Sequence, residues 1–229
     1  MSKVSEKDYI REDGRKVDES RLYDFSLESG LARYSHGKNL VLANCKKIVF
    51  PSPKSINWNE NLVQVDARYT MTPFSTNQRF SARPYSNKRS IEISKVIKQV
   101  FESVIFLEEY AKKQIYCIAD LLVTDAGTRC SAINALSYSL INSDIAHKDI
   151  PLAISFGKDI NNKVVLDLSY NEDTTGLADV PFAYNINSKS VSLMQMEGDL
   201  TFEEFKLGFQ YGRDELKKMY NKYFMINND

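Results

Sequence analysis

The sequence contains few of the residues on which several common chemistries depend. Of its 229 residues, three are cysteine, two are histidine and one is tryptophan. Cys45, Cys117 and Cys130 are odd in number and show no Cys-x-x-Cys spacing, so we expect reduced core thiols of a cytoplasmic protein. His36 precedes a glycine in an expected turn and His147 falls in a polar loop, and we expect both at the surface. A serine–histidine nucleophile or a histidine-rich metal site is therefore disfavoured.

Net charge and long apolar runs are also missing. Thirty basic and thirty acidic side chains cancel, so any contact with nucleic acid must come from a local patch. No apolar run reaches ~18 residues and the first residues are charged, so we expect neither a membrane span nor a secretion signal. An apolar content of 43% is that of an ordinary globular protein. We expect one compact α+β domain over residues 1–229, with residues 1–10 as a flexible arm.

The most informative local pattern is a buried strand that leads through a glycine turn into a helix. Apolar residues fill both faces of residues 114–124, which predicts a strand buried on both sides. Helical spacing of the later apolar residues starts a helix near Thr128, and Gly127 permits the turn. The first amides of that helix favour an anion, and Arg129 adds a five-donor guanidinium. The alternative is an ordinary capped turn with a surface arginine.

Basic residues gather around the start of a second amphipathic helix. From Ile93 to Ile105, apolar residues keep the spacing of one helix face, and the helix is expected to begin near Ser90. Residues 79–98 include six basic side chains and one acidic one. The alternatives are a solvated helix face and a patch that tracks phosphates, in which Arg89 is best placed.

A pair of aspartates accompanies another predicted strand, at residues 163–168. Asp167 lies near the end of this strand and Asp173 follows six residues later. Two such carboxylates can act as general acid and base or hold a divalent cation, whereas an acidic loop is the alternative. Thr201 and Glu204 form a capping box that begins a final helix. Further short strands are predicted at residues 27–35, 39–50, 63–72, 152–156 and 190–196.

Taken together, these segments carry a series of short motifs. They are Arg11–Arg15 (Arg-Glu-Asp-Gly-Arg), Tyr69–Thr76, Lys88–Ile97, Asp125–Arg129, Leu166–Leu168, Glu172-Asp173, Ala178-Asp179 and Gln195-Met196. In this order they resemble the RNase PH family over nearly the whole chain, and Asp-Ala-Gly-Thr-Arg is similar to the form in the catalytic subunit of the archaeal exosome. The resemblance implies an RNase PH-like fold (ribosomal protein S5 domain 2-like) of paired βαβα halves. It also implies a phosphorolytic 3′→5′ exoribonuclease.

The resemblance assigns roles to the residues already singled out. In phosphorolysis an anionic phosphate attacks an anionic ester, so cations and amides must offset their repulsion. The phosphate-binding residues would be Arg89, Gly127, Thr128 and Arg129. Asp173 would protonate the leaving 3′ oxygen or bind Mg²⁺ (or Mn²⁺), and Asp167 would position it or share the metal.

The resemblance also implies partners. Single-stranded RNA would be held by Lys54, Arg79, Arg83 and Lys88. The chain would form a hexameric ring of three heterodimers with an inactive RNase PH-like subunit, under a cap that binds RNA. The family's usual Ala-Asp-Gly-Ser is replaced by Leu31–Tyr34, and Lys88 replaces an arginine. Two alternatives are an inert scaffold subunit of such a ring and an unrelated anion-binding domain.

Overall fold

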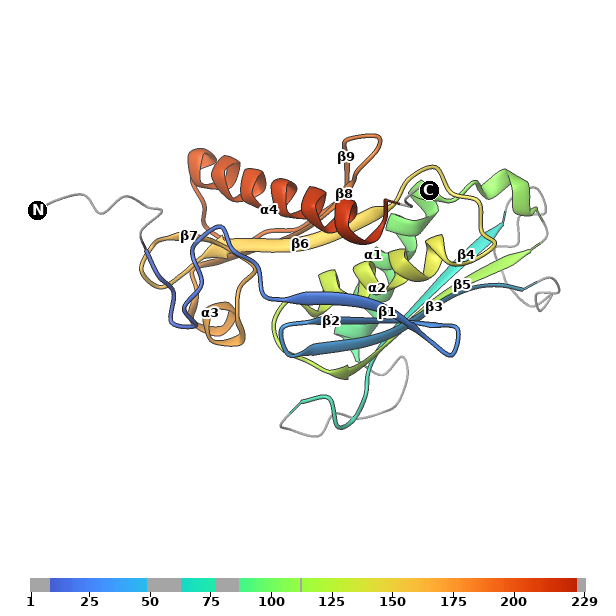
Figure 1. Ribbon diagram of the computed structural model, residues 1–229, viewed down its shortest axis with the longest axis horizontal. Helices are drawn as coiled ribbons and strands as arrows, with labels where there is room; N and C mark the ends of the chain where they lie inside the picture. The colour runs from blue at the N-terminus through green and yellow to red at the C-terminus, as the bar shows by residue number, and fades with distance from the viewer. Residues whose placement is uncertain (1–8, 49–62, 77–86, 112, 226–229) are drawn as a thin grey trace, which may run out of the picture.

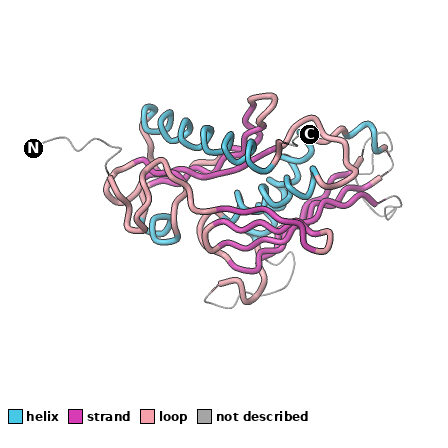
Figure 2. The backbone as a smooth tube through the Cα atoms, viewed as in Figure 1, coloured by secondary structure: helices cyan, strands magenta, loops and turns pink. Residues whose placement is uncertain are grey.

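Two sheets and their helices are stacked in four alternating layers (Figure 1). The structure, a computed structural model, describes residues 9–48, 63–76, 87–111 and 113–225. Figure 2 shows the order of the layers: a sheet, a pair of helices, a second sheet and a long outer helix. Within the described residues, no helix is long and apolar enough to cross a membrane.

The first sheet comes from the N-terminal half. Its strands are β1 (Tyr23–Glu28), β2 (Leu31–His36), β3 (Asn39–Ile48), β4 (Gln64–Met71) and β5 (Gln114–Val123). They lie in the order β1-β2-β3-β5-β4, with antiparallel pairing except between β4 and β5. A parallel pair needs a crossover, which α1 (Lys88–Val104) and a 3₁₀ turn, η2 (Leu107–Tyr110), supply.

The second sheet comes from the C-terminal half and is antiparallel throughout. Its strands are β6 (Pro151–Lys158), β7 (Val164–Leu166), β8 (Ala178–Asn185), β9 (Ser190–Met194) and β10 (Glu197–Gly198). They follow the order β10-β8-β6-β7, and β9 also pairs with β8. The short helix α3 (Tyr170–Thr175) connects β7 to β8, so α3 and β10 lie at the same end of the sheet.

Helix α2 (Thr128–Ile141) lies between the sheets, and α4 (Phe202–Tyr223) covers the outer face of the second sheet (Figure 1). Gly208 and Gly212 let α4 approach closely, because a Cβ at either position would collide with the ring of Phe156 or Phe182. One hydrophobic core continues through both sheets and all the layers. This continuity leads us to propose that the two halves fold as one unit.

Several elements match their predictions. The helices predicted near Ser90 and Thr128 are α1 and α2, and the capping box of Thr201 and Glu204 begins α4. Strands predicted at residues 63–72 and 152–156 are β4 and β6.

Other elements differ from their predictions. The strand expected at residues 27–35 is interrupted, because Ser29 and Gly30 take positive φ angles of 52° and 79° and turn β1 into β2. Strand β8 was not predicted, since it contains Pro181 and is buried on both faces without alternation. Strand β5 was predicted to be buried on both faces but is fully buried on one only: Cys117, Ala119 and Leu121 are buried, whereas Ile118 and Leu122 on the other face are half-buried.

Candidate active site

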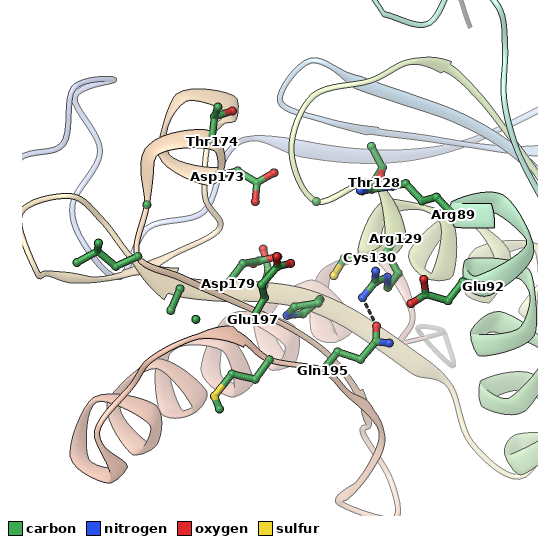
Figure 3. Close-up of a pocket in the computed structure, with 18 residues that line it drawn as sticks. Arg89, Glu92, Thr128, Arg129, Cys130, Asp173, Thr174, Asp179, Gln195 and Glu197 are labelled. Carbon is green, nitrogen blue, oxygen red and sulfur yellow. Dashed lines mark hydrogen bonds between the residues drawn. The ribbon is translucent and has the colours of Figure 1, made fainter. Parts of the chain in front are cut away.

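A pocket of about 650 Å³ opens where the two halves of the chain meet (Figure 3). The first half contributes Arg89 and Glu92 from α1 and residues 127–130 from the start of α2. The second half contributes Asp173 of α3, Asp179 of β8 and the segment 195–198 around β10, among others. Neither half alone forms the pocket, so its geometry depends on how the halves are joined.

The wall from the first half is built to attract an anion. Gly127 has a φ of 71° and starts α2 without a side-chain cap, so the positive end of the helix dipole faces the pocket. Thr128 lines the pocket as the first helical residue. Arg129 donates from Nη1 to Oε1 of Gln195. Arg89 extends into the pocket from the first turn of α1. Figure 3 shows the guanidinium groups and Thr128 on one side of the pocket.

The opposite wall carries carboxylates. Asp179 and Glu197 are directly paired across β8 and β10, and Asp173 extends from α3 toward them (Figure 3). Burial raises the pKa of Asp179 to about 7, and Asp173 and Glu197 nearby raise it as well, although the two pocket arginines oppose the shift. Burial and then Glu197 also raise the pKa of Asp173, which Arg89 lowers.

Asp179 is half-buried, and one of its carboxylate oxygens lacks a partner in the part of the chain that the structure describes. Its Oδ1 is buried and has no hydrogen-bond partner among the described residues. An unpaired buried carboxylate favours its neutral, protonated form, which explains the direction of the pKa shift. A group that carries a proton near neutral pH and faces an anion-binding wall can donate that proton during a reaction.

Asp167, expected beside Asp173 in the site, does not line the pocket. Arg21 donates from Nε to its Oδ2 at 2.9 Å and from Nη2 to its Oδ1 at 2.7 Å, and the carboxylate is 1% exposed. Nε2 of His36 lies 3.0 Å from the same Oδ2. Burial alone would raise the pKa of Asp167, but His36 and Arg21 hold that pKa well below its usual range. The carboxylate is buried among these cationic side chains, a setting that disfavours a metal ion at Asp167.

His36 is a correction to the sequence analysis, which expected it at the surface. Its side chain is 2% exposed, because β2 and β3 bury it against Asp167. Arg21 was not singled out at all, and its charge-rich surroundings in the sequence resemble a surface turn. Asp179 lies in a motif quoted for the resemblance, six residues after Asp173. That repeat of the spacing between Asp167 and Asp173 was the available signal.

Of the four residues expected to hold RNA, the structure describes Lys88 alone. Lys88 is exposed at the start of α1 and is not part of the pocket lining. Lys54, Arg79 and Arg83 lie outside the described residues.

The carboxylates of the pocket suit a magnesium ion that shares its ligands with a substrate. Among the described residues, no group of three or more histidine, cysteine or acidic side chains forms a complete metal site. Mg²⁺, however, commonly takes one or two carboxylates and completes its shell with water and phosphate oxygens. Asp179, with its unpartnered oxygen, and Asp173 fit that pattern.

Two family models together match most of the chain. Models of the RNase PH family match residues 22–146 as "3′ exoribonuclease family, domain 1" and residues 149–214 as "domain 2". The chain belongs to the 3′ exoribonuclease family. The boundary between the two matched ranges falls after α2, so the pocket combines the anion wall of the first range with the acidic wall of the second.

Similar proteins extend over most of the chain. The exosome complex component Rrp41 of Methanopyrus kandleri is 36% identical over 94% of this chain and 90% of its own length. That of Pyrococcus horikoshii is 34% identical over 93% and 92%. The crystal structure of rice (Oryza sativa) Rrp46 has a TM-score of 0.78 at 18% identity, covering 94% of this chain and 99% of its own, which supports the fold. The RNase PH resemblance, the fold class and the exoribonuclease prediction are confirmed.

Proposed function

We propose that the chain is a phosphorolytic 3′→5′ exoribonuclease subunit that uses inorganic phosphate to release nucleoside diphosphates from RNA 3′ ends. The observation that carries the proposal is the division of one pocket into an anion-attracting wall and an acidic wall. Phosphorolysis requires both, because a phosphate must be held close to an anionic ester while the leaving oxygen gains a proton.

The phosphate nucleophile binds at the start of α2. The free amides after Gly127, the hydroxyl of Thr128 and the guanidinium groups of Arg89 and Arg129 surround that position. An oxygen of the phosphate attacks the terminal phosphorus of the RNA. The bond from that phosphorus to the 3′ oxygen of the preceding nucleotide breaks, which yields a nucleoside diphosphate. The arginines stabilise the negative charge that accumulates on the transferring group.

The leaving 3′ oxygen takes its proton from the acidic wall. Asp179 suits this step best, because its pKa of about 7 keeps a large protonated fraction at neutral pH. Asp173, across from it on α3, remains a candidate for the same wall and helps to raise the pKa of Asp179. Asp167 acts from behind the pocket as a positioning residue, since its carboxylate is held by Arg21.

A divalent cation would be held by Asp173, which Asp179 would join only in its ionised form, and Mg²⁺ or Mn²⁺ would supply charge neutralisation at the phosphate oxygens. The chain's own contribution is to orient these carboxylates. Asp173 is fixed by α3, whose capping box joins Ser169 and Glu172, and Glu172 pairs with the buried Arg11.

The partners follow from the family. The chain works in a complex with other RNase PH-like subunits and acts on RNA. More specifically, we propose a hexameric ring of three heterodimers with an inactive partner, a cap that binds RNA, and a cytoplasmic location. Lys54, Arg79, Arg83 and Lys88 remain the proposed contacts to single-stranded RNA. The alternative of an inert scaffold is not favoured, because a scaffold needs neither a pair of pocket arginines nor an aspartate with a pKa of about 7.

The test is an RNA-shortening assay on the chain assembled with its partner subunit. We expect single-stranded RNA to shorten from the 3′ end only when inorganic phosphate is present, with nucleoside diphosphates as products. Chromatography of the products distinguishes the outcomes. Nucleoside monophosphates formed without phosphate would indicate hydrolysis, and no shortening by the full assembly would favour the scaffold.

A further inference from the structure

Arg21 does not line the pocket, yet it holds the turn from which α2 begins. Its Nη1 donates to Oδ2 of Asp125 at 3.0 Å, and its Nη2 donates to the carbonyl oxygen of Ala126 at 3.2 Å. A Cβ added to Gly127 would lie 3.5 Å from the same Nη2. Arg21 therefore lies against every residue of the turn immediately before Thr128, whose amide opens the anion wall.

The same guanidinium is anchored in the second half of the chain by Asp167. Nε and Nη2 donate to the two carboxylate oxygens, and the backbone amide of Arg21 donates to Oδ2 at 2.8 Å. The anchor is itself fixed, because Arg11 and Arg15 each donate to the carbonyl oxygen of Asp167 at 3.0 Å. Such over-determination allows Asp167 to keep a left-handed φ of 53°.

A second residue, Asn39, holds the turn from within the first half. Its Nδ2 donates to the carbonyl oxygen of Ala126 at 2.7 Å, and its Oδ1 accepts from the amide of Asp125 at 2.6 Å. Asn39 thus shapes the turn but cannot fix where it lies relative to β7 and α3. Among the described side chains, Arg21 is the one that bonds both to this turn and to Asp167.

We propose that Arg21 is a positioning residue that sets the phosphate-binding turn against the acidic half of the site. The inference rests on the proposed function and adds a residue to it. The planar guanidinium presents five N–H donors in one rigid group, and the turn and Asp167 together use four of them. Lysine would retain the charge but could not bond to both the turn and Asp167. The Arg21→Lys substitution therefore separates the effect of positioning from the effect of charge.

The experiment measures kcat, the KM for phosphate and the KM for RNA on the chain assembled with its partner. For Arg21→Lys we expect the KM for phosphate to rise roughly tenfold, as for other supporting residues behind a site, while kcat and the KM for RNA change less than about threefold. Arg213→Lys, the same exchange at a half-buried arginine of α4 that does not line the pocket, should leave all three values unchanged. Thermal unfolding and ring assembly are measured on each variant.

A second variant tests whether the raised KM for phosphate arises only from a loss of folding stability. Arg21→Gln combined with Asp167→Asn removes both buried charges, so neither is left unpaired, yet the fork to the turn is still lost. We expect this variant to assemble and to show the raised KM for phosphate. An unchanged KM in either assembled variant overturns the inference, and so does failure of both variants to assemble. If the unaltered assembly does not depend on phosphate for shortening RNA, the proposed function is contradicted instead.

Discussion

Two aspartates of the second half, Asp167 and Asp179, are both withdrawn from solvent but have opposite surroundings. Arg21 and His36 face the carboxylate of Asp167, whose pKa lies well below its usual range. Asp179 faces Asp173 and Glu197, has an unpartnered oxygen, and has a pKa of about 7. Burial acts in the same direction on both, so the difference comes from the neighbours. The paired carboxylate of Asp167 therefore supports the fold, whereas the unpaired carboxylate of Asp179 is available for chemistry.

The largest effect should follow the loss of the unpartnered acid. Asp179→Asn keeps the size of the side chain but cannot give up a proton, so we expect kcat to fall by up to about 10⁴-fold. Binding of RNA, measured by fluorescence anisotropy, should survive. Asp173→Asn serves as the comparison, and a smaller loss there would assign the proton to Asp179. Full turnover by Asp179→Asn would remove Asp179 from the mechanism.

The pH profile tests the same assignment without a substitution. An acid must be protonated to act, so kcat/KM should be highest below about pH 7 and fall as the pH rises through the pKa of Asp179. The KM for phosphate, followed over the same range, separates this effect from the ionisation of phosphate itself. A rate that instead falls toward acidic pH would mark Asp179 as a ligand that must be ionised.

Loss of the partnered acid should act on stability. Asp167→Ala leaves Arg21 without its main buried partner, and we expect the free energy of unfolding to fall by about 3–5 kcal/mol. Because the folded pKa of Asp167 is lowered, the stabilisation is present above its unfolded pKa and is lost as the pH falls through the folded value. Denaturant titrations at several acidic pH values measure both effects. A single unfolding transition would also support one folding unit.

Substitution of a pocket arginine should reduce activity more than substitution of a surface residue, but less than substitution of Asp179. Arg129→Ala removes one positive charge that faces the transferring phosphoryl group. We expect this to cost roughly 2–4 kcal/mol of transition-state stabilisation. The ratio of kcat/KM values for phosphate measures this loss. Arg68→Ala, which breaks an exposed ion pair with Asp120 on the first sheet, is the matched control and should change the ratio little.

The smallest change is expected from Glu197→Gln. Glu197 is exposed and lies opposite Asp179 across the strand pair, where its charge raises the pKa of Asp179. Removing that charge lowers the pKa, so the alkaline limb of the rate profile should move to lower pH with little change in maximal kcat. An unmoved limb would show that burial and Asp173 set the pKa of Asp179 without Glu197.

The sequence predicted the elements that follow a strong local rule. The amphipathic spacing of α1, the glycine turn before α2 and the capping box of α4 depend on neighbouring residues, and all three were recovered. The hairpin at Ser29 and Gly30 was missed, since a two-residue turn within an apolar stretch leaves a weak signal. Strand β8 was missed because burial on both faces removes the alternation by which strands are recognised.

The site was predictable on one side and less so on the other. Local pattern placed Gly127, Thr128 and Arg129 together, the family resemblance added Arg89, and all four line one pocket. Asp167 and Asp179 could not be told apart, because their roles depend on partners distant in the chain. Arg21 lies 146 residues before Asp167, and no spacing rule links them.

Helix α2 is bonded to both of the sheets that enclose it. Ser139 accepts from the amide of Cys45 on β3 at 2.7 Å, and Asn134 exchanges two hydrogen bonds with the backbone of Ala153 on β6. Under the proposed function we therefore expect the phosphate-binding end of the site to be the stationary end, since a shift of α2 would break its hydrogen bonds to both sheets. As the RNA shortens by one nucleotide per cycle, its new 3′ end would have to advance toward the start of α2.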